Sequence, residues 1–400
     1  MLQNKTHMPM LAYNQADHRS QQIALARQAV LRDGNSLSST GTPGWIERSW
    51  RRCLESGKTP DQKVSFDVVL PAAMRLLVEA NRDLVSTARP VLQSLSHAIA
   101  STRYFAILTD ARGVVIDAYG PIDRSDRRAD LITQIGTDLS EQRLATTAIS
   151  AALSELQPVW IHRGEHFFDV NSVYSCAGAP LFGPGGACIG MLDLTGIEAP
   201  EQPELKHLVA QSARSIENAM TIGRLSGQRD VLIRLNWPGR TLGDETDGLV
   251  CLNADGQVTG ANQMARMMVP QLNTGRDNSN STPIHASDLF AMPHDMLFDA
   301  ARRQSNKAAL EVPLWTGLRL HALPLMREQA QISGHSSGHS SAKASSSVPV
   351  TPPPPLKDIE TALIRQAVDQ ARGNVQKAAR ALGISRATVY RRLGSGLKRH

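Results

Sequence analysis

Alternating apolar and polar residues predict two β-hairpins in separate parts of the chain. The first covers 104–120, where the alternation continues on both sides of a turn at Asp110–Gly113. The second covers 248–260 and turns at Asp255–Gly256, a dipeptide favoured in tight hairpin turns. Further strands are expected over 157–195, 309–314 and 318–323, where short apolar runs end at Gly or Pro.

Apolar residues spaced three or four apart predict helices around these strands. One helix should cover 43–56, with Thr42–Pro43 as its cap and first turn. A second should cover 70–100 and bend at Pro90. Asn262 is expected to cap a short helix after the second hairpin. The other predicted helices of this part of the chain cover 138–156 and 203–235.

A low-complexity segment separates this mixed α/β body from the C-terminus. Residues 331–355 are rich in Ser and Gly and end in the proline run Pro352–Pro355. Such a composition cannot bury an apolar core, so the segment is interpreted as a tether. Its GHSSGHSS repeat supplies only two histidines, which is too few to favour a metal site.

Positive charge gathers after the tether. Residues 356–400 hold ten Lys or Arg against three Asp or Glu, although the whole chain carries a net charge of only +6. A near-neutral body with a basic tail is typical of nucleic-acid-binding proteins. Aromatic residues are only 4% of the chain, which disfavours a surface of base-stacking aromatic side chains.

Three short helices are predicted in this basic tail. Gly373 ends the first helix and Asn374 caps the second, while Gly383 and Ser385 do the same between the second and the third. The small side chain of Ala379 lets the helices approach one another. Two helices joined by a glycine-containing turn describe a helix-turn-helix.

The third helix carries the side chains that suit DNA. Arg386 and Arg391 are candidates for base readout, because a guanidinium can bind guanine in bidentate fashion. Thr388 can contact a thymine methyl, and other cations can contact phosphates. The candidate DNA-binding residues are Asn374, Lys377, Arg380, Ser385, Arg386, Thr388, Arg391 and Arg392.

Other classes of protein are disfavoured by composition. The first twenty residues have no apolar core of a signal peptide, and the uncharged run 170–192 is broken by Gly and Pro. The four cysteines are scattered without a CxxC pair, as in proteins of a reducing compartment. We therefore expect a cytoplasmic protein with no membrane partner and no cofactor.

Several stretches resemble a known family. The segment 373–393, GNVQKAARALGISRATVYRRL, resembles the Fis-type helix-turn-helix. The body resembles the sensory half of acetoin-catabolism-regulator-like, sigma-54-dependent activators in SWRRCLESGKTP (49–60), EHFF (165–168) and SCAGAPLFGPGGACIGMLDLTG (175–196). The resemblance implies an α+β multidomain chain. Its expected parts are an N-terminal helical segment (1–69), a GAF-like sensor (70–225), a PAS-like domain (240–326), a linker (327–355) and an all-α helix-turn-helix (356–400).

The chain departs from this family in two places. Such activators carry a central ATPase with a GxxxxGK[ST] phosphate loop, whereas the single Gly-Lys here, Gly57–Lys58, has Arg52 where the first glycine should be. We therefore expect no ATP hydrolysis and no enzyme activity. The second departure is RLATTAISAAL (143–153), where Ala145, Thr147 and Ser150 replace a Gly-Thr-Asn-Ala-Ile-Gly-like pattern, so the family's ligand preference does not carry over.

A small-molecule pocket is expected in the GAF-like part. Glu165, His166 and Cys176 are its candidate ligand-binding residues, because they interrupt an otherwise apolar sheet. His162 and the Glu165–His166 pair also match the HxxEH zinc pattern. That chemistry needs both histidines on one helix face, whereas the preceding residues read as a strand, so we do not favour zinc.

The sequence thus favours a transcriptional regulator whose DNA-binding tail is controlled by a sensory body. The expected partners are double-stranded DNA with a pseudo-palindromic operator, a small-molecule effector and a second copy of the chain. RNA polymerase and full-length relatives are further candidate partners. The alternative is a nucleoid-type architectural protein that uses its body only to oligomerise.

Overall fold

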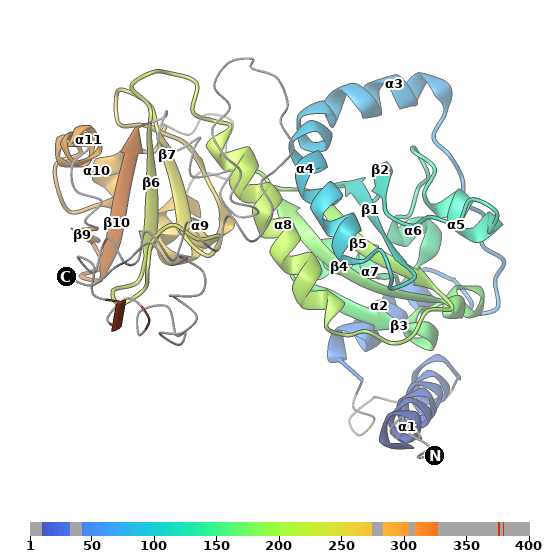
Figure 1. Cartoon of the computed structure of the whole chain (residues 1–400). Coiled ribbons are helices and arrows are strands. Elements are labelled where there is room, and N and C mark those ends of the chain that lie inside the picture. The colour runs from blue at the N-terminus through green and yellow to red at the C-terminus, as the bar shows by residue number, and fades with distance from the viewer. Residues whose placement is uncertain are drawn as a thin grey trace, which may run out of the picture. The chain divides into compact units, whose positions relative to one another are not determined.

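The computed structural model describes residues 10–32, 42–273, 283–303 and 309–326, with Val375, Gln376 and Ala379 (Figure 1). The chain divides into two compact units, Met1–His339 and Ser340–His400. In the second unit Val375 and Ala379 are helical and buried, one turn apart. No helix in the described part of the chain combines the length and apolar character needed to cross a membrane.

Five antiparallel strands form the first sheet, in the order β2-β1-β5-β4-β3. Both the hairpin predicted over 104–120 and the strands predicted over 157–195 are present. The Asp110 carboxylate accepts the N–H groups of Arg112 and Val114 across the hairpin turn, each at 2.9 Å. The strands are β1 (Tyr104–Asp110), β2 (Val115–Tyr119), β3 (Val159–His162), β4 (Tyr174–Phe182) and β5 (Cys188–Ile197).

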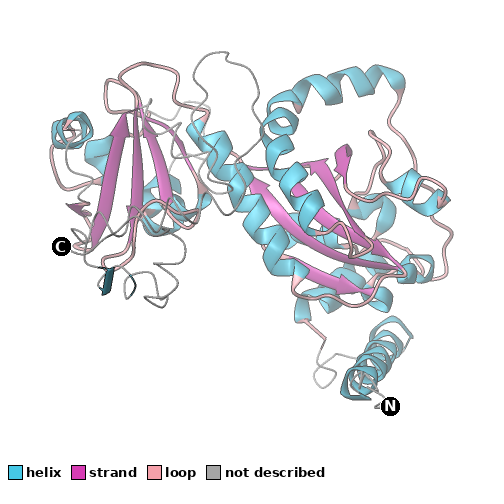
Figure 2. Cartoon of the chain, in the orientation of Figure 1, coloured by secondary structure: helices cyan, strands magenta, loops and turns pink. Residues whose placement is uncertain are grey.

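Helices cover both faces of this sheet (Figure 2). Successive side chains of a strand point to opposite faces, so Leu108 enters one core and its neighbour Ile107 the other. The Leu108 core is shared with α3, α4 and α8, and the Ile107 core with α5, α6 and α7. The helices are α3 (Pro71–Ala80), α4 (Arg82–Ala98), α5 (Arg127–Ile132), α6 (Glu141–Leu144), α7 (Ala148–Glu155) and α8 (Leu205–Ile222).

The N-terminal helices pack beside the second of these cores. They are α1 (Met10–Arg27), which continues into a π-helical turn, η1 (Gln28–Arg32), and α2 (Gly44–Glu55). Ile46 and Trp50 of α2 are fully buried against Phe167 and Phe168, which follow β3. Pro43 occupies the N-cap of α2 without a side-chain hydrogen bond, so the expected Thr42 cap does not form.

A second antiparallel sheet has the order β8-β7-β6-β10-β9. It contains the hairpin predicted over 248–260 and the two strands predicted near Thr316–Gly317. As predicted, Asn262 caps α9 by accepting the N–H of Ala265 at 2.8 Å. The elements are β6 (Val231–Asn236), β7 (Gly248–Leu252), β8 (Val258–Ala261), α9 (Gln263–Met268), α10 (Ala286–Leu289), α11 (Asp295–Arg302), β9 (Leu310–Pro313) and β10 (Arg319–Met326).

The helix predicted over 203–235 was too long. It ends at Ile222, and β6 begins at Val231 and pairs with β7 and β10. Between them the Asp230 carboxylate accepts the N–H groups of Ser226 and Gly227 at 2.8 and 2.7 Å, which fixes a turn. The second sheet therefore includes a strand that lies before residue 240, where the sequence suggested that a domain begins.

Two other predicted helices are interrupted. The predicted helix over 70–100 is divided at Asn81, whose side-chain amide donates to the Leu77 carbonyl at 2.8 Å, and Pro90 lies within its second part, α4. The helix over 138–156 breaks at Ala145, whose φ of 55° and ψ of −138° are rarely adopted by L-residues. Thr147 and Ser150 then form a reciprocal capping box that restarts the helix as α7.

Candidate functional site

A cavity of about 40 Å³ lies between the first sheet and the helices α5, α6 and α7. Its wall is mostly apolar, and one water needs about 10–15 Å³ of such space. The apolar lining residues are Phe66, Ile107, Ile132, Leu139, Leu144, Ala148 and Ile149. The residues with polar atoms are Thr147, His166, Asn171, Tyr174, Cys176, Asp193 and Thr195.

Asp193 and Thr195 of β5 form the polar floor of this cavity. The Thr195 hydroxyl donates to Oδ2 of Asp193 and lies 3.4 Å from the Cys176 thiol. Burial raises the pKa of the Asp193 carboxyl to about 7, and the Thr195 hydroxyl partly offsets this rise. The sequence analysis did not select Asp193, although a carboxylate between Leu192 and Leu194 in an apolar strand was a usable signal.

His166 and Cys176, two of the three expected ligand-binding residues, line the cavity together. Nδ1 of His166 lies 2.9 Å from the Arg163 carbonyl, so Nδ1 carries the proton and Nε2 is free to accept. Nε2 lies 3.8 Å from the Cys176 thiol. Burial lowers the pKa of His166 to about 4 and raises that of Cys176, so both side chains are uncharged at neutral pH.

Glu165, the third expected residue, lies away from the cavity lining. Its carboxylate accepts the N–H of His162 at 2.7 Å and pairs with Arg19 of α1 at 3.0 Å. Burial raises the pKa of Glu165 to about 7, against the lowering effect of Arg19. The structure therefore gives Glu165 the part of a buried anchor for α1.

The HxxEH pattern does not place its two histidines on a shared face. His162 ends β3, and residues Arg163–Glu165 form a 3-10 turn, η2. Nδ1 of His162 lies 2.8 Å from the Ser175 hydroxyl, whereas the His166 ring turns toward the cavity. The two rings thus have different partners, as the strand prediction implied.

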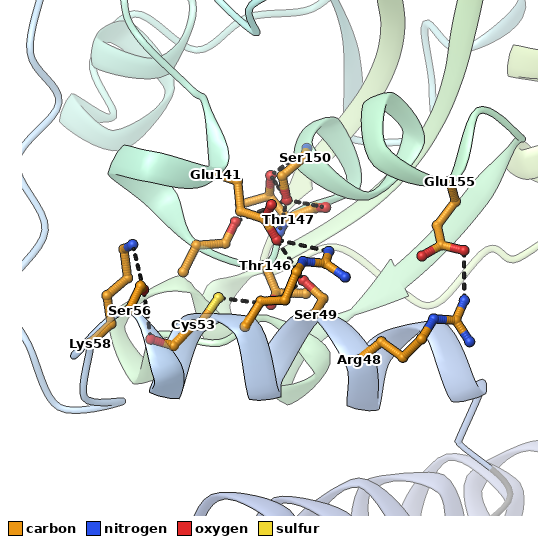
Figure 3. Close-up of polar contacts among 12 residues, drawn as sticks. Arg48, Ser49, Cys53, Ser56, Lys58, Glu141, Thr146, Thr147, Ser150 and Glu155 are labelled. Carbon is orange, nitrogen blue, oxygen red and sulfur yellow. Dashed lines mark hydrogen bonds and ion pairs between the residues drawn. The ribbon is translucent and has the colours of Figure 1, made fainter.

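Helix α2 supports the cavity wall from outside (Figure 3). The Ser49 hydroxyl lies 3.0 Å from the Glu141 carboxylate and 2.8 Å from the Thr146 hydroxyl. The Cys53 thiol lies 3.6 Å from the same Thr146 hydroxyl. These contacts attach α2 to the segment between α6 and α7, whose neighbours Leu144 and Thr147 line the cavity.

Arg27 of α1 holds the loop that carries His166. Its guanidinium donates to the carbonyls of Gly164 and Phe167 at 2.8 and 3.0 Å, as well as to the His166 carbonyl at 2.5 Å. It also pairs with Asp169 and lies 5.7 Å from the centre of the Trp50 ring. The N-terminal helices are therefore part of the structure that positions the cavity.

Glu217 lies on α8, which covers the opposite face of the first sheet, and it should make the stability of the protein depend on pH. It accepts the Phe182 N–H at 2.8 Å, and burial raises its pKa to about 7. Because the folded state binds the carboxyl proton more tightly than the unfolded chain does, the protonated Glu217 contributes to stability. This contribution is complete below about pH 4.5 and is lost as the pH rises through 7. Glu217→Gln keeps the hydrogen-bond acceptor but does not ionise. The free energy of unfolding of the variant minus that of the native chain should therefore be about 2 kcal/mol larger at pH 8 than at pH 5.

Chemical denaturation at the two pH values measures this difference. Glu55→Gln, a change at an exposed carboxyl of α2, is the matched control. Parallel stability profiles for Glu217→Gln and the native chain would contradict the assignment.

The predicted DNA-binding residues, from Asn374 to Arg392, lie outside the described residues. Within that segment Ala379 is 3% exposed. The contacts of the third helix therefore stay a prediction from sequence.

Two protein-family profiles match this chain, one in its N-terminal half and one near its C-terminus. The profile described as "Bacterial regulatory protein, Fis family" matches residues 355–394. The profile described as "MimR, N-terminal domain" matches residues 21–218, which include the end of α1, the whole of α2 and the whole first sheet. The latter match agrees with the attachment of α1 and α2 to the cavity wall.

Three curated relatives are transcriptional regulators. The acetoin catabolism regulatory protein of Cupriavidus necator is 31% identical over 56% of this chain and 34% of its own length. The acetoin dehydrogenase operon transcriptional activator AcoR of Bacillus subtilis is 25% identical over 44% and 29%. The propane 2-monooxygenase operon transcriptional activator MimR of Mycolicibacterium smegmatis is 27% identical over 48% and 31%. The matches thus span about a third of each relative's length.

Among solved structures, a chain of the E. coli DhaR(N)–DhaL complex is 14% identical and aligns with 70% of this chain and 99% of its own length, with a TM-score of 0.43. The predicted α+β fold class agrees with the two described sheets and their helices. The predicted regulator family agrees with the profile matches and with the relatives. The chain thus combines a segment that matches the MimR N-terminal domain with a C-terminal segment that matches the Fis family of bacterial regulatory proteins.

Proposed function

We propose that this protein is a sequence-specific DNA-binding transcriptional regulator. The observation that carries the proposal is the Fis-family match over 355–394, which covers the predicted helix-turn-helix and its outward arginines. Arg386 and Arg391 read bases, while Lys377, Arg380 and Arg392 contact phosphates. Binding DNA and an effector forms and breaks no covalent bond, so the proposed function involves no enzyme activity. The proposed location is the cytoplasm, where the DNA lies.

The sensory half of the proposal rests on the cavity under α7. It is enclosed by a domain that matches the N-terminal domain of an operon activator, and His166 and Cys176 meet inside it. A small molecule bound there would contact the sheet and α7 together. The alternative, a nucleoid-type architectural role, has no matching observation among the relatives, which are operon regulators.

A combined binding experiment tests the proposal. Selection from a random duplex library should recover a pseudo-palindromic site, and a metabolite panel should then change the affinity of the intact chain for that site. Enrichment of no sequence motif would contradict specific binding. A motif whose affinity no metabolite alters would restrict the protein to constitutive regulation.

We further propose that the protein acts as a homodimer through α3. Leu76 and Val78 are 73% and 55% exposed, and Leu77 is the single buried residue of this mainly apolar helix. Two antiparallel copies aligned at Leu77 would place Arg75 of one opposite Glu79 of the other, and the reverse. This self-complementary charge pattern favours a second copy as the occupant. RNA polymerase and full-length relatives stay candidate partners of the assembled dimer.

Leu76→Glu is expected to shift the protein toward monomer, because it places a second carboxylate beside the partner's Glu79. Sedimentation or light scattering over a concentration series measures the change. Val170→Glu, which alters a residue that is also more than half exposed but lies after β3, is the matched control. A dimer of unchanged affinity in Leu76→Glu would exclude α3 from the interface.

A further inference from the structure

Asp193 carries an unused hydrogen-bonding atom inside the cavity. The residue is 0% exposed, and its Oδ2 accepts the Thr195 hydroxyl. Its Oδ1 is buried and has no hydrogen-bond partner among the described residues. A buried polar atom without a partner is costly, so a site that keeps one is suited to a ligand that supplies the missing partner.

The residues around Oδ1 disfavour a negatively charged ligand. None of the described residues that line the cavity is Lys or Arg. A carboxylate or phosphate would therefore enter a mainly apolar site that holds a carboxyl group and no compensating cation among its lining residues. The neutral His166 and Cys176 offer no positive charge either, because burial lowers the pKa of His166 to about 4.

The cavity also limits size and polarity. About 40 Å³ is room for a compact molecule only, and seven of the lining residues are apolar. An ammonium group has three donors to satisfy, which a mainly apolar wall does not favour. A hydroxyl needs one acceptor, and a carboxyl group can accept from it whether ionised or protonated.

We propose that the cavity binds a small uncharged molecule with a hydroxyl group, which donates its hydrogen bond to Oδ1 of Asp193. The carbon skeleton packs against Ile107, Ile149 and the other apolar lining residues. Asp193 is thus the residue that determines specificity for the polar group of the effector. This inference rests on the proposed sensory function and names the chemical class of its ligand.

Four probes with the same number of carbons test the choice of polar group. Butan-1-ol, butanone, butanoate and butylamine are titrated into the full-length protein by calorimetry. Butan-1-ol should bind saturably and more tightly than the other three. Equal or tighter binding of butanone, butanoate or butylamine would overturn the assignment, as would the absence of saturable butan-1-ol binding.

Two variants at Asp193 test the residue itself. Asp193→Leu removes the acceptor and should weaken butan-1-ol binding at least about tenfold. Asp193→Asn keeps an acceptor and removes the negative charge, so it should retain butan-1-ol and bind butanoate more tightly than the native chain does. Unchanged butan-1-ol affinity in Asp193→Leu, or no gain of butanoate binding in Asp193→Asn, would contradict the proposal.

Matched controls separate this inference from the proposed function. Glu217→Gln changes another buried carboxyl, outside the cavity lining, and should leave the affinities for all four probes unchanged. DNA binding is measured on the same preparations. Loss of the ligand result with intact sequence-specific DNA binding would overturn the ligand class alone, whereas loss of DNA binding would overturn the proposed function.

Discussion

Replacing Arg386 with alanine is expected to relax the DNA sequence preference at one position of each half-site. A bidentate arginine–guanine contact contributes about 1–3 kcal/mol of discrimination against the wrong base. Arg391→Ala should have an effect of the same size at a different position, and the double variant should lose most specificity. Binding-site selection followed by titration against single-base variants of the selected duplex measures both effects.

Lys377→Ala is the matched control for this prediction. A phosphate contact contributes through counterion release, so its loss should weaken binding to all sequences alike. The slope of log affinity against log salt concentration should also become shallower by about one. Equal effects of Arg386→Ala and Lys377→Ala on specificity would contradict the assigned roles.

Trp50→Ala is expected to destabilise the N-terminal domain by about 3–5 kcal/mol, the range for removal of a large buried aromatic side chain. The Trp50 side chain is 0% exposed, and its indole N–H donates to the Glu165 carbonyl at 3.0 Å. The Arg27 guanidinium also stacks over its ring. Truncation would therefore release both α2 and the loop that carries His166. Thermal and chemical denaturation of the intact chain measure the loss.

Trp315→Ala provides the comparison at an exposed tryptophan. Its side chain is 65% exposed, and its indole N–H donates to the Ser287 carbonyl at 2.8 Å. An exposed substitution of this kind should cost well under the Trp50 value, about 0.5–1 kcal/mol. Similar losses for the two variants would show that α2 is not an integral part of the domain.

Local patterns predicted the two hairpins well because each one pairs strands that are adjacent in the chain. The turns at Asp110–Gly113 and Asp255–Gly256 have the residues that their backbone needs, and Gly113 and Gly256 have φ of 86° and 78°. The alternation on each side of these turns matches the two faces of each strand. Sequence and structure agree here because the interactions are close in the chain.

The errors concern helix ends and breaks. Helix α8 ends at Ile222 with Gly223 as its C-cap, and the contacts of Asp230 with Ser226 and Gly227 that fix the following turn depend on the turn itself. Strand β6 also pairs with β7 and β10, and the distant partner β10 gives it no local signal. Ala145 breaks a helix in a backbone region that alanine rarely adopts, so its residue type favours the wrong prediction.

The candidate site was only partly predictable. His166 and Cys176 were selected as polar residues in an apolar region, and both line the cavity. Glu165 has the same local pattern, but its side chain points to Arg19, more than a hundred residues away in the chain. Asp193 was missed although its position between Leu192 and Leu194 was a usable signal, whereas the unmet hydrogen-bonding capacity of its Oδ1 depends on packing that only the folded chain reveals.

Genome-wide occupancy of the intact protein, compared with that of the Arg386→Ala, Arg391→Ala double variant, tests the central claim most directly. The account predicts a small set of sharp peaks that share a pseudo-palindromic sequence and that disappear in the double variant. Broad occupancy without a shared sequence would contradict specific regulation and favour an architectural role. The absence of occupancy by the intact protein would show that the basic tail serves a partner other than DNA.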